Sequence, residues 1–143
     1  MQRIMIHRNY PVDRARLWDL ATDYSVLSRV MIGLVRFDGL PEDRIKKGQT
    51  LDIRVSLLGW LPKRPYRIDV VECDERCYTI RTEERGHGIN RSNHTTIIAG
   101  TGTESLWIDF IEIEAGWLTI PATLWARLIY TMRHPRRLRM LGV

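Results

Sequence analysis

WLTIPATLWARLIYTMRHPRRLRML, residues 117–141, is the only segment long and periodic enough to form one long helix. Pro121 suits the first turn of such a helix, and Thr119 just before it can cap the helix start. A helix of this kind needs a large apolar surface to lie on, and only strand-like runs precede it. The sequence therefore predicts a sheet that holds a terminal helix, although the same helix would also suit a solid core without a cavity. An apolar residue recurs at every fourth position, as Ile120, Leu124, Leu128 and Met132.

The chain before this helix alternates between apolar and polar residues, as strands with one buried face do. The clearest run is residues 51–57, where apolar side chains alternate with Asp52, Arg54 and Ser56. No connection among the later strands is long enough for a crossover helix, so we expect an antiparallel sheet. Gly100-Thr101-Gly102 predicts a tight turn between the last two strands. The predicted strands are residues 3–10, 34–37, 51–57, 66–70, 78–82, 93–99 and 104–115.

Two short helices are predicted directly after the first strand. Asp13 can cap the first, which has Leu17 and Trp18 on its apolar side. Asp23 can cap the second, which ends at Gly33. The order is then one strand, two short helices, six strands and one long helix. This order predicts an α+β fold in which residues 1–143 form a single domain, with a curved antiparallel sheet of about seven strands.

The composition is that of an ordinary globular protein, with 44% hydrophobic and 27% charged residues. Residues 1–11 lack the apolar core of a signal peptide. The longest apolar region, residues 117–132, is too short for a transmembrane helix and contains Arg127. We therefore expect a cytoplasmic protein without a transmembrane segment. The sequence leaves both a monomer and a homodimer open.

The net charge of +5 is concentrated near the end of the sequence. Without Arg133, Arg136, Arg137 and Arg139, 18 basic residues face 17 acidic ones, so the rest of the chain is almost neutral. A surface of that kind argues against a nucleic-acid partner. Because Pro135 interrupts helical hydrogen bonding, we expect the basic tail after it to be solvated and dispensable for folding. The alternative is a tail that docks on an anionic membrane or RNA.

Neither the cysteines nor the histidines show the spacing of a metal site. Cys73 and Cys77 match neither the C-x-x-C redox spacing nor a zinc site, so we expect free thiols in a reducing compartment. The four histidines form no H-E-x-x-H or comparable motif. The sequence therefore indicates no metal and no cofactor. Gly86-His87-Gly88 is interpreted as a hinge.

Three motifs carry a resemblance to a known family. Residues 10–18, YPVDRARLW, place a proline and then an aliphatic–tryptophan pair between the first strand and the first helix. NHTT at residues 93–96, followed by Gly102-Thr103, Leu106 and Asp109, is similar to the family's penultimate hairpin. EAGWLT at residues 114–119 leads into an Arg/His-rich terminal helix. On these motifs the chain resembles the START-like helix-grip (SRPBCC) superfamily, and within it the polyketide cyclase/dehydrase and lipid-transport-like group.

The resemblance covers essentially the whole chain and implies a helix-grip fold. It implies that a curved antiparallel sheet and a terminal helix enclose a cavity for hydrophobic small molecules. It supplies no catalytic motif, and the members of the group differ widely in activity, so it leaves the function open.

Asp109 and His94 are the candidate catalytic residues. The last strand can turn Asp109 inward, because it then lies between apolar neighbours. An inward carboxylate would have a raised pKa unless a cation or hydrogen-bond donors reach it. His94 on the neighbouring strand is its natural partner, and an Asp–His pair in an apolar pocket suits acid–base catalysis. The alternative is a structural hydrogen bond between them. The inward set is then Trp107, Asp109, Ile111 and Ile113, against Leu106, Ile108, Phe110 and Glu112.

The leading hypothesis is a protein that binds, transports or sequesters a hydrophobic or aromatic small molecule in an internal cavity. The second hypothesis is a cyclase or dehydratase that uses Asp109 and His94 on a polyketide-like substrate. The third is an interaction module that docks its Arg-rich tail on an anionic partner. The predicted ligand-binding residues are Ile53, Val55, Tyr66, Ile68, Tyr78, His94, Trp107, Asp109, Ile111, Leu124 and Leu128.

Overall fold

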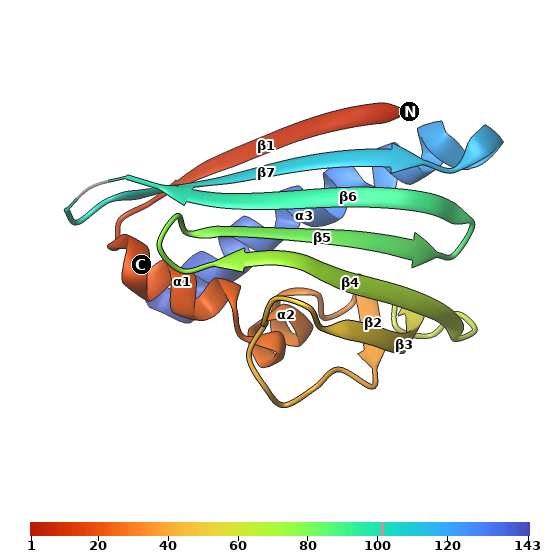
Figure 1. The fold of residues 1–143 in the computed structure, drawn as a ribbon, viewed down its shortest axis with the longest axis horizontal. Coiled ribbons are helices and arrows are strands. Elements are labelled where there is room, and N and C mark those ends of the chain that lie inside the picture. Colours follow the sequence, from red (N-terminus) through yellow and green to blue (C-terminus); the bar gives the residue numbers. More distant parts are fainter. Residues whose placement is uncertain (101) are drawn as a thin grey trace.

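The computed structural model describes residues 1–100 and 102–143 and contains one seven-stranded antiparallel sheet in the order β1-β7-β6-β5-β4-β3-β2 (Figure 1). Thr101, in the predicted turn 100–102, lies outside the described residues. The sheet therefore has the predicted number of strands, and several of them are longer than predicted. The strands are β1 (Gln2–Tyr10), β2 (Val35–Asp38), β3 (Thr50–Leu57), β4 (Arg64–Asp74), β5 (Thr79–Gly86), β6 (Ile89–Ala99) and β7 (Ser105–Glu114).

The helices occupy the predicted places in the chain. Helices α1 (Arg14–Ala21) and α2 (Tyr24–Val30) follow β1, and a short 3₁₀ turn, η1 (Gly116–Leu118), leads into the long α3 (Thr119–Leu141). Asp13 caps α1 by accepting a hydrogen bond from the Arg16 amide, and Asp23 caps α2 in the same way. No helix in the described part of the chain is long and apolar enough to cross a membrane. This α+β arrangement is a helix-grip fold.

The faces of the sheet follow the period-two pattern of the sequence. On β7 the side chains of Trp107, Asp109 and Ile111 are buried, whereas Phe110 is exposed. The predicted inward set is therefore confirmed. Asp109 lies opposite Thr96 in the β6–β7 pair. The face that packs against α3 thus carries one fully buried carboxylate among apolar side chains.

Helix α3 turns a different face to the sheet than its apolar stripe predicts. Ile120, Leu124 and Leu128 are 65%, 63% and 47% exposed. The prediction that this stripe faces the sheet is wrong, because another face of α3, which includes Tyr130, Arg133 and Arg137, is buried instead. The buried face is more polar and consists of Ala126, Ile129, Tyr130, Arg133, His134, Arg137 and Leu141.

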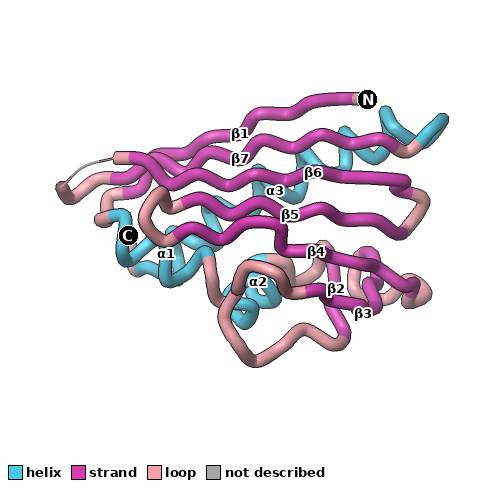
Figure 2. Tube along the Cα trace, in the orientation of Figure 1, coloured by secondary structure: helices cyan, strands magenta, loops and turns pink. Residues whose placement is uncertain are grey.

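The predicted solvated tail is also wrong, because α3 continues through Pro135 and packs against the rest of the chain. Arg16 donates a hydrogen bond from Nη2 to the Leu141 carbonyl at 3.0 Å, and Figure 2 shows this end of the chain beside α1. Arg136 donates to the Val30 carbonyl at 2.9 Å. The last turns of α3 are therefore part of the core, although Pro135 lies inside the helix.

Candidate functional site

A pocket of about 280 Å³, here called the outer pocket, lies between the sheet and the first half of α3. Its walls are mainly apolar, and at one end it is bordered by His87 in the β5–β6 turn and Leu118 in η1. Gly88 allows this close approach, because a Cβ there would come within 2.9 Å of Leu118 Cδ1. The sheet and helix residues that line it include Val35, Val55, Leu57, Tyr66, Ile111, Ile113, Ala122, Trp125, Ala126 and Ile129.

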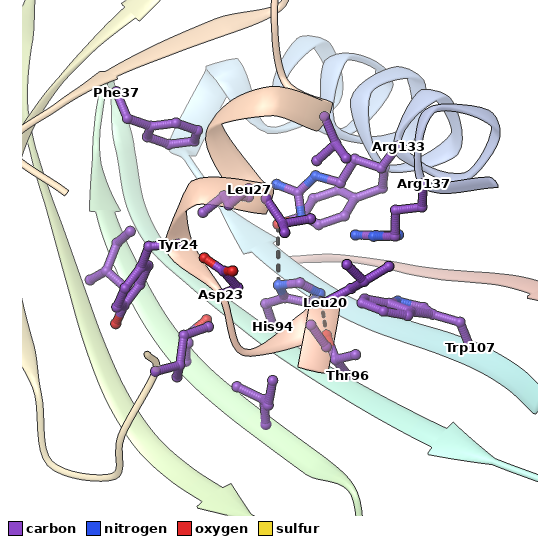
Figure 3. A pocket seen from close by; sticks show the side chains of 18 of the residues that line it. Leu20, Asp23, Tyr24, Leu27, Phe37, His94, Thr96, Trp107, Arg133 and Arg137 are labelled. Carbon is purple, nitrogen blue, oxygen red and sulfur yellow. Dashed lines mark hydrogen bonds between the residues drawn. The ribbon is translucent and has the colours of Figure 1, made fainter. Parts of the chain in front are cut away.

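A second pocket of about 100 Å³, the inner pocket, lies toward the other end of α3, beneath α1 and α2 (Figure 3). Its polar side chains include His94 and Thr96 of β6 and Arg137 of α3. The two pockets share four lining residues, which we call the junction. The junction consists of Phe37, Glu84, Tyr130 and Arg133.

Asp109 is fully buried behind the inner pocket and accepts three hydrogen bonds. His94 Nε2 donates to Oδ1 at 2.7 Å, Thr96 Oγ1 donates to Oδ1 at 2.9 Å, and Trp107 Nε1 donates to Oδ2 at 2.9 Å. Burial by itself raises the pKa of Asp109. The hydrogen bond from His94 and the charges of His94, Arg137 and Arg133 outweigh it and hold the pKa below the usual range. Asp109 is therefore an ionised acceptor, as expected where donors reach it.

His94 connects Asp109 to the junction. With a proton on Nε2 alone, the ring donates to the carboxylate and leaves Nδ1 as an acceptor, 3.3 Å from the Tyr130 hydroxyl. Burial raises the pKa of Tyr130, with a smaller contribution from Glu84, so the hydroxyl stays protonated and donates to His94. The chain Asp109–His94–Tyr130 thus ends with a hydroxyl that lines both pockets, where it can donate or hold a proton.

His134 lies on the other side of Asp109. Its Nδ1 accepts from the Tyr10 hydroxyl at 2.6 Å, and Arg137 Nη1 lies 3.3 Å away. Because arginine only donates, the proton of the neutral ring is on Nε2, which lies 4.0 Å from Asp109 Oδ2. Burial, followed by the charge of Arg137, lowers the pKa of His134 to about 4. His134 is therefore a neutral, structural member of the polar cluster.

The predicted ligand-binding residues divide into four groups. Val55, Tyr66 and Ile111 line the outer pocket, and Ile68, His94 and Trp107 line the inner one. Asp109 lies behind His94 and lines neither pocket of the described chain.

The other four predicted residues lie outside both described pockets, so the prediction that they line the cavity is corrected. Ile53 is buried in the core beside Gly39, outside both described pockets. Tyr78 lies in the turn before β5, away from both pockets. Its ring packs edge-to-face against Trp18, with 5.7 Å between the ring centres. Leu124 and Leu128 are on the exposed side of α3.

The sequence interpretation missed Glu84, Tyr130, Arg133 and Arg137 as pocket residues. The three on α3 follow Ala126 at helical spacing, which is a detectable signal, but charged side chains at the end of a helix are usually solvated. In residues 1–100 and 102–143, no group of three His, Cys, Asp or Glu side chains is placed to hold a metal ion.

No family model matches the sequence, and no curated protein matches it either. Solved structures do match. Protein CV1439 of Chromobacterium violaceum superposes with a TM-score of 0.77 at 13% identity, over 96% of this chain and 95% of that one. Major latex-like protein 151 of Panax ginseng gives 0.72 at 12%, over 97% and 96%. DynU16, from the dynemicin biosynthetic locus, gives 0.66 at 14%, over 99% and 47%. At these identities the likeness shows a shared fold.

Proposed function

We propose that this protein binds an apolar or aromatic small molecule in the outer pocket, and so transports or sequesters it. The observation that carries the proposal is the hollow of about 280 Å³ between the sheet and α3, with apolar side chains on both walls. Ligand sites are typically concave and mainly apolar, with a few polar groups that fix orientation. The junction supplies such groups at one end of the pocket.

The size of the pocket favours a compact ligand. Sites for drug-sized molecules start at about 300 Å³, so the outer pocket suits a fused-ring aromatic better than a long acyl chain. We also propose that the chain is a member of the START-like superfamily, in its polyketide cyclase/dehydrase and lipid-transport-like group. The sequence motifs and the fold shared with DynU16 support this assignment.

Titration with N-phenyl-1-naphthylamine, a neutral probe that fluoresces in apolar surroundings, tests the binding function. We expect saturable binding at about one probe per folded chain, together with a change in tryptophan emission, because Trp125 lines the outer pocket. Native mass spectrometry of the purified protein should detect any ligand that co-purifies. If the probe binds only to urea-unfolded protein, the proposed function fails.

A dehydratase or cyclase is the second candidate, and the Asp109–His94–Tyr130 chain favours it. In a dehydration, His94 would take a proton from the carbon beside a ketone, and the Tyr130 hydroxyl would give a proton to the leaving hydroxyl and regain one from His94. The C–H and C–O bonds break, a C=C bond forms, and water leaves. His94 and Tyr130 face the pockets and are the candidate catalytic residues, whereas Asp109 would position His94.

Conversion of 4-hydroxy-4-phenylbutan-2-one to its enone, followed by ultraviolet absorbance, tests the second candidate. We expect wild type to accelerate the loss of water and His94→Gln to abolish the acceleration. Binding of the neutral probe by His94→Gln should persist, since His94 does not line the outer pocket as described here. If wild type and His94→Gln dehydrate the ketone at equal rates, His94 has no catalytic role, and its hydrogen bond to Asp109 is structural.

A further inference from the structure

Two buried arginines face the inner pocket from successive turns of α3. Figure 3 shows Arg133 and Arg137 projecting from α3 into the pocket, with Arg137 over Trp107. Their exposed fractions are only 8% and 4%. Arg133 also belongs to the junction and so borders the outer pocket. Charged side chains are rarely buried to this extent unless a partner compensates them.

Neither guanidinium has a carboxylate partner in the described part of the chain, where no carboxylate oxygen lies within 4.0 Å of either group. Arg133 donates from Nε to Met31 Sδ at 3.2 Å, a weak acceptor, and this contact uses neither terminal nitrogen. The guanidinium also lies 4.2 Å from the centre of the Tyr130 ring. Arg133 therefore presents a planar set of donors beside two pockets.

The nearby carboxylates, by contrast, already accept hydrogen bonds. Glu84 at the junction accepts from the Tyr66 hydroxyl at 3.0 Å and from the Thr82 hydroxyl at 2.9 Å. Asp23, which lines the inner pocket, accepts from the amide and hydroxyl of Ser25 at 2.9 and 2.7 Å. Asp109 accepts three hydrogen bonds, as described above. These carboxylates thus have donors of their own, whereas Arg133 makes its one hydrogen bond in the described residues through Nε, so acceptor oxygens of a ligand would complement its terminal nitrogens.

We propose that the ligand carries a carboxylate, which Arg133 binds at the junction while the apolar body fills the outer pocket. A carboxylate matches the fork of an arginine in two parallel hydrogen bonds, and such pairs are strong where water is excluded. A ligand without acceptors would leave the Arg133 donors unpaired beside it, which costs free energy. This inference rests on the proposed binding function and names the substrate class of the same pocket.

A pair of isosteric ligands tests the proposal. 2-Naphthoate and 2-acetylnaphthalene have nearly the same shape, but the first has a carboxylate where the second has a neutral ketone. Each is used at pH 7 to displace N-phenyl-1-naphthylamine from the protein. We expect wild type to bind the acid at least tenfold more tightly than the ketone. Equal affinity of wild type for the two ligands would overturn the carboxylate proposal while the proposed binding function stands.

Arg133→Met keeps the unbranched stem but removes the charge, and should abolish the preference for the acid. Arg133→Lys keeps the charge but loses the fork and should retain part of it. Arg139→Met, at an exposed position on the same helix, is the matched control and should behave as wild type.

If Arg133→Met keeps the preference for the acid, Arg133 is not the partner of the carboxylate. If N-phenyl-1-naphthylamine does not bind wild type at all, the proposed function fails and this inference with it. If Arg133→Met fails to fold, the affinities of wild type and Arg133→Lys for the acid and the ketone decide whether the carboxylate proposal holds.

Discussion

Arg137 stacks on Trp107, with its guanidinium carbon 3.7 Å from the centre of the ring. The contact joins the last turns of α3 to the beginning of β7, and both side chains are almost completely buried. A desolvated cation over an indole ring contributes about 2 kcal/mol. Residues that resemble a solvated basic tail are therefore part of the core.

Deletion of residues 134–143 should abolish cooperative unfolding. It removes the buried side chains of His134, Arg137 and Leu141, and it exposes Trp107 and Tyr10. Thermal unfolding followed by circular dichroism measures the effect. Deletion of Val143 alone is the control, because its side chain is exposed. A truncated protein that melts within a few degrees of wild type would show that the contacts of these last turns contribute little.

Ala126→Phe should fill the outer pocket and block probe binding. Ala126 is buried on α3 and its side chain lines this pocket. Overpacking of a filled core costs about 1–3 kcal/mol, so the substitution should cost less if the space is free. Leu124→Phe adds an aromatic ring to the exposed side of the same helix and should leave binding unchanged. Binding by Ala126→Phe with wild-type affinity would place the probe elsewhere.

Stability should fall on acidification from pH 7 to pH 5. Folding lowers the pKa of His134 from 6.5 to about 4, so the unfolded chain binds a proton in this window and the folded chain does not. The stabilisation is complete above pH 6.5 and is lost as the pH falls toward 4, which amounts to about 2 kcal/mol at pH 5. The lowered pKa of Asp109 acts in the same direction, because the folded protein loses the stabilisation from this carboxylate as the pH falls further. Urea unfolding at both pH values measures the difference.

His134→Gln is the matched variant for the pH measurement. It removes the titrating group but retains an acceptor for Tyr10 and Arg137. The variant should be less stable at pH 7, and its stability should change less between pH 7 and pH 5. An unchanged pH dependence would assign the acid sensitivity to other groups.

Both cysteines should react with Ellman's reagent in the native protein, Cys77 before Cys73. Both are free, and Cys77 is exposed whereas Cys73 is half-buried. Burial raises the pKa of the Cys73 thiol and the charge of Asp74 raises the pKa of the Cys77 thiol, so the difference in exposure decides the order. Stopped-flow absorbance measurements without reductant should resolve two phases of the thiol reaction, one for each cysteine. A single disulfide that forms on purification in air would contradict the expectation of two independent thiols.

The strands and caps could be predicted from the sequence because their signals are local. On the last strand the period of two left two possible inward sets, and the apolar neighbours of Asp109 favoured the set that places it inside, beside His94. Asp13 and Asp23 cap helices through side-chain contacts within three residues of themselves. Such features depend on neighbours in sequence and need no knowledge of the opposite wall.

The face of α3 could not be predicted in this way, because it is chosen by distant partners. Tyr130 lies against His94, and Arg137 against Trp107, so polar side chains occupy the face that hydrophobicity assigns to solvent. Leu124 and Leu128 are displaced to the outside as a consequence. These partners lie on β6 and β7, far from α3 in the sequence, so no pattern within the helix predicts them.

The hydrogen bond between Tyr10 and His134 joins residues 124 positions apart, and β1 completes the sheet by pairing with β7. During synthesis, the first strand therefore leaves the ribosome long before either partner exists. Until then its apolar side chains, Ile4 and Ile6, have no strand to cover them. Closure of the sheet must therefore order a long stretch of chain, and contacts between residues so far apart in sequence slow folding.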